Sequence, residues 1–195
     1  SRIGGWWIAT PVLAFVLAYL SGKYVHPTVI KWLVTHESEA EIRRTIGKLL
    51  TISGCYVAYS AGANNAANAV GPLVGTGFMD SMTGAVIGGL TLGLGAILIG
   101  GRILQTIGTG IVELCTIRAV SIEAIAAIIV HAASLSGMPV ALGQIIPAAV
   151  IGIGYAEHGK GTVKNRTVRR IVLMWILSPL LAGTIAYTAI VFVGA

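Results

Sequence analysis

The sequence predicts an all-α integral membrane protein. Only 10% of its 195 residues are charged and the mean hydropathy is +0.86, whereas soluble domains carry roughly 25% charged residues. Apolar runs recur along the chain, and several approach the ~20 residues that a helix needs to cross the hydrocarbon core. Glycine is abundant, with 26 residues, as is common in transmembrane helices. We therefore expect a multi-pass protein of the cell membrane that contacts lipid.

The first apolar run covers residues 3–20 and is expected to end at Ser21-Gly22-Lys23. A second run begins at Lys48 but is interrupted at residues 62–65. The remaining runs cover residues 82–101, 121–136, 140–155 and 171–193.

Lysine and arginine are concentrated in two connecting segments, residues 21–48 and 157–170. Four membrane crossings separate these segments, so both are expected on the same side. Cytoplasmic loops carry an excess of Lys and Arg, which places that side in the cytoplasm.

A segment near the start of the chain recurs near its end. At a constant offset of 168 positions, residues 2–14 share Arg, Ile, Trp, Pro, Leu and Ala with residues 170–182. Matching leucines or alanines would be expected by chance in apolar helices, but Trp7 also aligns with Trp175. The pattern therefore indicates an internal repeat.

This repeat predicts how the chain is organised. Residues 1–24 would be the last helix of a first repeat that is mostly absent, and residues 25–195 would form a complete second repeat. We count five crossings in the second repeat, and an odd number makes equivalent helices antiparallel. A re-entrant course of residues 102–118 is the alternative, and it would change this count. Inverted repeats of this kind are common in transporters, with sites near the midplane.

Three asparagines fall within five positions of an apolar run: Asn64, Asn65 and Asn68. Gly62 and Gly71-Pro72, on either side, predict a broken helix, whose backbone is tolerated only where it is covered or lines a cavity. Carbonyl oxygens of asparagine coordinate cations and amide hydrogens hold anions. We therefore predict a binding site here, with Na⁺ at Asn64 and Asn68. The alternative is a hydrogen-bonded cluster that joins helices.

The same segment carries a family resemblance. Residues 62–69 read Gly-Ala-Asn-Asn-Ala-Ala-Asn-Ala, which resembles the Gly-Ala-Asn-Asp-Val-Ala-Asn-Ala signature of inorganic phosphate transporters. Further likeness lies in residues 101–109, 137–140 and 169–175, in the order of the family's C-terminal half. The resemblance implies a helical transporter with two inverted halves, which moves phosphate with Na⁺ or H⁺ by alternating access. It also implies that an upstream half of the same transporter completes the site.

Two departures from the family pattern concern the substrate. The family usually has Asp where this chain has Asn65, and Ser-Thr-Thr-His where it has Ala141-Leu142-Gly143-Gln144. Backbone amides of Leu142 and Gly143 still suit an anion if a helix begins there, and Gln144 keeps a polar side chain. Sulfate is therefore the alternative substrate. A non-transporting membrane subunit with a degenerate site is the third interpretation.

Other function classes are not indicated. The net charge of +6 comes from basic residues in the loops, so it does not predict nucleic-acid binding. Neither a nucleophile–base pair, nor paired carboxylates, nor a phosphate-binding glycine loop points to an enzyme. We expect no cofactor beyond Na⁺ or H⁺ as the coupling ion, and a homodimer is left open.

Overall fold

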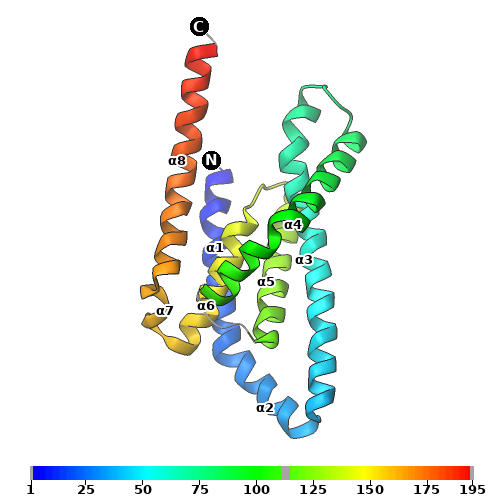
Figure 1. The fold of residues 1–195 in the computed structure, drawn as a ribbon, viewed down its shortest axis with the longest axis vertical. Coiled ribbons are helices and arrows are strands. Elements are labelled where there is room, and N and C mark those ends of the chain that lie inside the picture. The colour runs from blue at the N-terminus through cyan, green and yellow to red at the C-terminus, as the bar shows by residue number, and fades with distance from the viewer. Residues whose placement is uncertain (1, 111–114, 194–195) are drawn as a thin grey trace.

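The computed structural model describes residues 2–110 and 115–193, which contain helices and no strand (Figure 1). In chain order the elements are α1 (Arg2–Leu20), the π-helical turn η1 (Ser21–Val25), α2 (His26–His36), α3 (Glu39–Gly75), α4 (Ser81–Gly110), α5 (Thr116–Leu135), α6 (Leu142–His158), α7 (Lys160–Lys164) and α8 (Arg166–Val193). Four helical stretches of the described chain are long and apolar enough to span a membrane: Ile3–His36, Ser81–Gly101, Thr116–Leu135 and Arg166–Phe192. The predicted all-helical membrane architecture is confirmed.

Helix α1 ends at Leu20, before Ser21-Gly22-Lys23 as expected, but the chain stays helical beyond it, which the sequence did not indicate. Helix α1 passes through η1 into α2 without a loop, so one helical rod extends to His36. Polar side chains do not end a helix, and a π-turn accommodates an irregularity while backbone hydrogen bonding continues. The boundary expected after residue 24 falls inside η1, and the division into repeats stays a prediction.

Helix α3 is continuous, so the predicted break in this segment was wrong. Residues 62–65 and Gly71-Pro72 all lie within its 37 residues. Glycine weakens a helix by about 1 kcal/mol without ending it. Proline lies in the last turn, where its missing N–H removes one hydrogen bond. At the other end, Ser38 and Glu41 exchange hydrogen bonds in a capping box that stabilises the start of α3.

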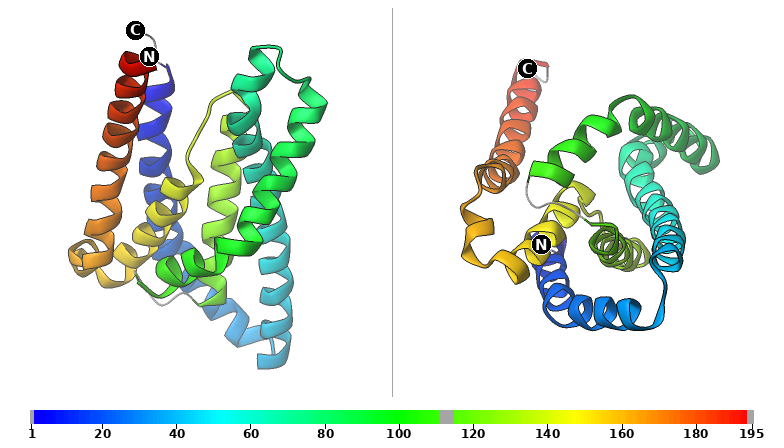
Figure 2. Two further views of the ribbon diagram at one scale, coloured as in Figure 1. Left: turned by 45° about the horizontal axis from the view of Figure 1, so that its top comes forward. Right: turned by 60° about the horizontal axis from the view of Figure 1, so that its bottom comes forward.

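The chain between α5 and α6 forms a link of six residues, 136–141, longer than the gap 137–139 between the apolar runs 121–136 and 140–155 of the sequence (Figure 2). Gly137 has a φ of 65°, a conformation that glycine adopts readily. The Met138 N–H then bonds the Ala133 carbonyl (2.8 Å), which closes the end of α5. Helix α6 returns in the direction opposite to α5 (Figure 1).

Two parallel helix pairs, α3 with α5 and α1 with α6, form the interior (Figure 1). The α1–α6 pair is especially close: a Cβ atom at Gly152 would clash with the Phe15 carbonyl oxygen, and Ala14 and Ala18 are fully buried. Helix α4 returns antiparallel to α3 and meets it with two of its glycines. Small residues at such contacts let membrane helices approach closely.

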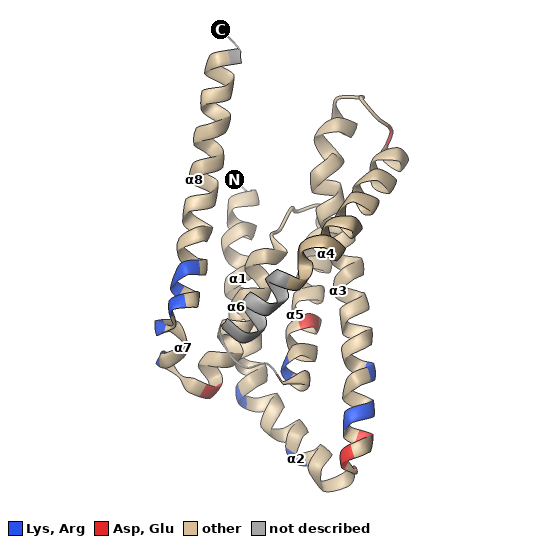
Figure 3. Cartoon of the chain, in the orientation of Figure 1, with Lys and Arg blue, Asp and Glu red and all other residues tan. Residues whose placement is uncertain are grey.

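Charge distinguishes the two ends of the molecule. Figure 3 shows Lys and Arg gathered toward the end that carries the α2–α3 connection and α7. Helices α3 to α6 lie between these two segments in the chain, so four passes return it to the same end. The two basic segments, residues 21–48 and 157–170, therefore lie at the same end, and the assignment of that end to the cytoplasm stays a prediction.

Candidate functional site

Helices α3 and α5 pack in one register, and this packing positions the asparagines. The Ser53 hydroxyl on α3 donates to Glu123 Oε2 on α5 (2.5 Å). Eleven residues further along each helix, Asn64 Nδ2 donates to Ser134 Oγ (3.2 Å). Both pairs are 70 positions apart in the chain, as parallel helices require. Polar groups in an apolar membrane interface are paired because an unpaired one costs free energy. The register therefore brings Asn64 to the C-terminal end of α5.

The Asn64 side chain is 5% exposed and holds the link that follows α5. Its Nδ2 also donates to the Met138 carbonyl (3.1 Å), and its Oδ1 accepts the Val140 N–H (3.3 Å). The link is not helical, so its buried backbone needs partners from elsewhere. We call Asn64 with Ser134, Met138 and Val140 the asparagine clamp. At Asn64 the structure has the hydrogen-bonded cluster that the sequence left open as the alternative.

Asn65 and Asn68 flank the clamp and keep hydrogen-bonding capacity to spare. Asn68 donates one amide hydrogen to Asn64 Oδ1 (3.3 Å), and its carbonyl oxygen has no partner among the described residues. The partly buried side chain of Asn65 likewise makes no hydrogen bond to the described part of the chain. Each amide group offers two donors and one acceptor oxygen. These two side chains, unlike that of Asn64, keep groups free for a ligand, and ligand binding by them stays a prediction.

The same hydrogen bonds bear on the predicted Na⁺ position. Asn64 Oδ1 already accepts two N–H groups, which uses both of its lone pairs. Asn68 Oδ1 remains as the carbonyl oxygen with spare capacity. Within the described ranges, no group of three or more His, Cys, Asp or Glu side chains could hold a metal ion.

A buried hydroxyl lies one turn before the clamp. Ser60 is on the same helix as Asn64, four residues earlier, and both side chains are buried. Ser60 is 1% exposed, and its Oγ has no hydrogen-bond partner in the described structure. A polar atom in this state costs free energy unless something satisfies it, so Ser60 adds a third group with unused capacity to this part of α3.

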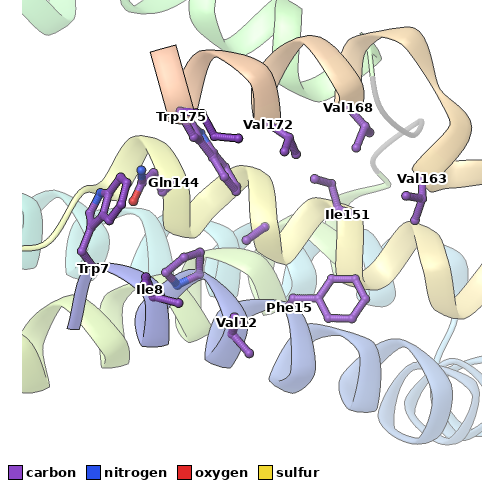
Figure 4. A pocket seen from close by; sticks show the side chains of 13 residues that line it. Trp7, Ile8, Val12, Phe15, Gln144, Ile151, Val163, Val168, Val172 and Trp175 are labelled. Atoms are coloured by element: carbon purple, nitrogen blue, oxygen red, sulfur yellow. The ribbon is translucent and has the colours of Figure 1, made fainter. Parts of the chain in front are cut away.

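The second predicted part of the site is divided between two places. Leu142 and Gly143 form the first turn of α6, directly after the link that Asn64 holds, and the first N–H groups of a helix have no intrahelical acceptor. Gln144 instead lines a cavity of about 440 Å³ between α1, α6 and α8, next to Trp7 (Figure 4). The described lining of this cavity contains no residue of α3, so Gln144 does not join the asparagines.

Sequence reasoning missed the groups that bind Asn64. Ser134, Met138 and Val140 lie 70 to 76 positions further along the chain, a separation that no local pattern reveals. The signal in the sequence was Gly137-Met138-Pro139, which marks a turn but does not say what the turn contacts.

Comparison with known proteins identifies the family. The sequence profile described as the phosphate transporter family matches residues 1–186. The chain belongs to the phosphate transporter family. Sulfate permease CysP of Bacillus subtilis is 34% identical over 185 residues, which are 95% of this chain and 51% of the permease. The chloroplastic inorganic phosphate transporter 2-1 of Arabidopsis thaliana is 31% identical over 153 residues, 72% of this chain and 26% of that protein. No solved structure matches significantly.

Membership of the phosphate transporter family confirms the resemblance found in the sequence. It indicates a multi-pass membrane transporter rather than an enzyme, in agreement with the four candidate spans. The chain spans about half the length of the sulfate permease and about a quarter of the chloroplastic transporter. Relatives within the phosphate transporter family are named for both phosphate and sulfate, so the family alone does not identify the oxyanion.

Proposed function

We propose that this chain is half of a secondary transporter for a tetrahedral oxyanion, with phosphate as the first candidate, coupled to Na⁺ or H⁺. The observation that carries the proposal is the asparagine clamp, which joins the middle of α3 to the link before α6. An oxyanion beside the clamp would meet the amide groups of Asn65 and Asn68. It would also meet the free N–H groups and the positive dipole end of α6.

Sulfate is the second candidate, and two observations favour it. The relative that covers 95% of this chain is named a sulfate permease. Asn65 is neutral where the family resemblance has Asp, so this site has one negative charge fewer. Sulfate carries no proton near neutral pH and needs only donors, whereas phosphate keeps a proton that favours an acceptor carboxylate.

The rest of the site would come from an upstream half of the same transporter. Helices α1 and α8 carry the repeated residues 2–14 and 170–182 and run in opposite directions (Figure 1), which supports an inverted repeat. The chain covers about half of the sulfate permease, which agrees with one repeat of two. In this arrangement α5, the link 136–141 and α6 form a helical hairpin whose tip is held by Asn64, and alternating access occurs around it.

Uptake into proteoliposomes tests the proposal. The complete gene product is reconstituted, and uptake of radiolabelled phosphate is measured with unlabelled sulfate as competitor, under a Na⁺ gradient and separately under a pH gradient. Saturable phosphate uptake that sulfate barely inhibits supports the first candidate, and the reverse preference supports the second. Folded protein that takes up neither anion under either gradient would refute transport and favour the non-transporting subunit.

A further inference from the structure

Helix α1 buries a stripe of small residues against α6. Thr10, Ala14 and Ala18 recur every four positions and are 3%, 0% and 0% exposed. Opposite them, Gly152 leaves the space that the close approach needs, because a Cβ atom there would meet the Phe15 carbonyl oxygen and Ala18. Small residues at this spacing are typical of closely packed membrane helices.

The internal repeat places the same stripe on α8. At the offset of 168 positions, the three stripe residues of α1 align with Ser178, Ala182 and Ala186, which are all exposed. Helix α8 meets the rest of the described chain through its N-terminal half, where Val172 and Trp175 line the cavity toward α1 and α6 (Figure 4), and the aligned residues follow further along the helix. The α8 stripe (Ser178, Ala182 and Ala186) is therefore uncovered, although its counterpart is the buried face of α1.

We propose that the α8 stripe is the docking surface for a helix equivalent to α6 that belongs to the other half of the transporter. The inference rests on the proposed two-repeat architecture and names the contact through which the halves pack. In an inverted repeat, α8 packs against a helix of that half in the same way that α1 packs against α6. The docked helix therefore runs parallel to α8, as α6 runs parallel to α1, and carries a small residue at the position equivalent to Gly152.

A second copy of this chain is a poorer occupant of the α8 stripe. Its α6 already has the Gly152 face covered by its own α1, so that face is not free to dock elsewhere. The matched part of the sulfate permease is 51% of its length, which leaves room for a second repeat with its own α6 equivalent. The occupant with a free complementary face is therefore a helix of that other half.

Disulfide cross-linking tests this contact without depending on transport. In the complete gene product, freed of native cysteines, Ala182→Cys is combined with a cysteine scan through the part of the protein outside residues 1–195. Leu181→Cys is the matched control, because Leu181 is the next residue of α8 and projects about 100° around the helix from Ala182. Disulfides form only when the two Cα atoms lie within roughly 7 Å. We expect intramolecular cross-links from position 182, recurring every three or four residues along one helix, and none from position 181.

Each other outcome overturns the proposal. Cross-links that join two copies and increase with protein concentration would assign the α8 stripe to a dimer. Equal yields from positions 181 and 182 would show that the contact is not specific to the stripe, and no cross-link from either position would show that the stripe faces lipid. As an independent measurement, Ala182→Phe should lower the melting temperature of the complete protein, and Leu181→Phe should leave it unchanged. Because no substrate is involved, absent anion uptake with intact cross-links would refute the proposed function and leave the docking contact standing.

Discussion

Replacing Asn64 with alanine would remove four hydrogen bonds at once. Two of them satisfy backbone groups of the link, the Met138 carbonyl and the Val140 N–H. Val140 is buried, so water does not replace the lost acceptor. Each buried group left unpaired costs about 1–3 kcal/mol, so the pair predicts a loss of roughly 2–6 kcal/mol in the free energy of unfolding.

Asn65→Ala is the informative comparison, because Asn65 sits next to Asn64 on the same helix. Its side chain bonds no described residue, so its removal should change the free energy of unfolding by no more than about 0.5 kcal/mol. If Asn65 binds the oxyanion, losing one polar contact costs about 1–3 kcal/mol of binding, or roughly 5- to 150-fold in affinity.

Both variants are measured in the complete gene product by thermal unfolding and by initial rates of uptake into proteoliposomes. Thr91→Ala on α4 is the control, since among the described residues the Thr91 hydroxyl bonds only carbonyls of its own helix. Asn64→Ala should lower both the stability and the uptake rate. Asn65→Ala should raise the KM of uptake at unchanged stability. The control Thr91→Ala should leave stability and uptake unchanged. A stable and active Asn64→Ala protein would refute the clamp, and an unchanged KM in Asn65→Ala would exclude Asn65 from the site.

Topology is tested with single cysteines in a cysteine-free background: Ser38→Cys and the exposed Lys164→Cys should react with an impermeant reagent from the cytoplasm, and Phe78→Cys from outside. Labelling of positions 38 and 164 from opposite faces would contradict the four-pass arrangement. Gly152→Val should destabilise the α1–α6 pair by about 1–3 kcal/mol, because a Cβ atom there has no space; an unchanged melting temperature would show that the pair can separate. Hydrogen bonds from Ser38 lower the pKa of Glu41, so their stabilisation of α3 is present above about pH 4.3 and is lost as pH falls through the lowered pKa. Protection of the amides in the first turn of α3 against exchange, relative to the intrinsic exchange rate at each pH, should fall only in that acidic range, and Ser38→Ala should remove this pH dependence.

The apolar runs and basic connections were predictable because a bilayer imposes length and charge rules on every segment separately. The ends of the helices were less predictable from the sequence. Gly62 and Gly71-Pro72 looked like interrupters, but a glycine costs only about 1 kcal/mol, and contacts with α4 and α5 along α3 can offset such a loss. Ser21-Gly22-Lys23 became a π-turn for the same reason: local preference is weak against a long helix that packs on its neighbours.

The asparagine site was predictable in part. Three amides in an apolar run indicated either a ligand-binding site or a hydrogen-bonded cluster between helices. In the structure Asn64 belongs to a hydrogen-bonded cluster. The register of α3 against α5 decides that the hydrogen-bonding groups of Asn64 are used while Asn65 and Asn68 keep free groups. No local pattern in the sequence encodes this register. Gln144 follows Gly143 directly in sequence, yet the helical turn between neighbouring residues directs it into the cavity beside α1.

The polar pairs along α3 and α5 limit how such a transporter can move. Ser53–Glu123 and Asn64–Ser134 are eleven positions apart on each helix, about 16 Å along the axis. Sliding α5 by one turn, about 5.4 Å, would break both pairs and the clamp together.

Helix α6 is tied to α1 by the close glycine contact. Alternating access would therefore move α3 with α5 as one body and α1 with α6 as another, bending at η1 and at the link 136–141. The asparagines lie where these bodies meet, because the link that Asn64 holds leads directly into α6, so a ligand bound there is positioned to sense their relative movement.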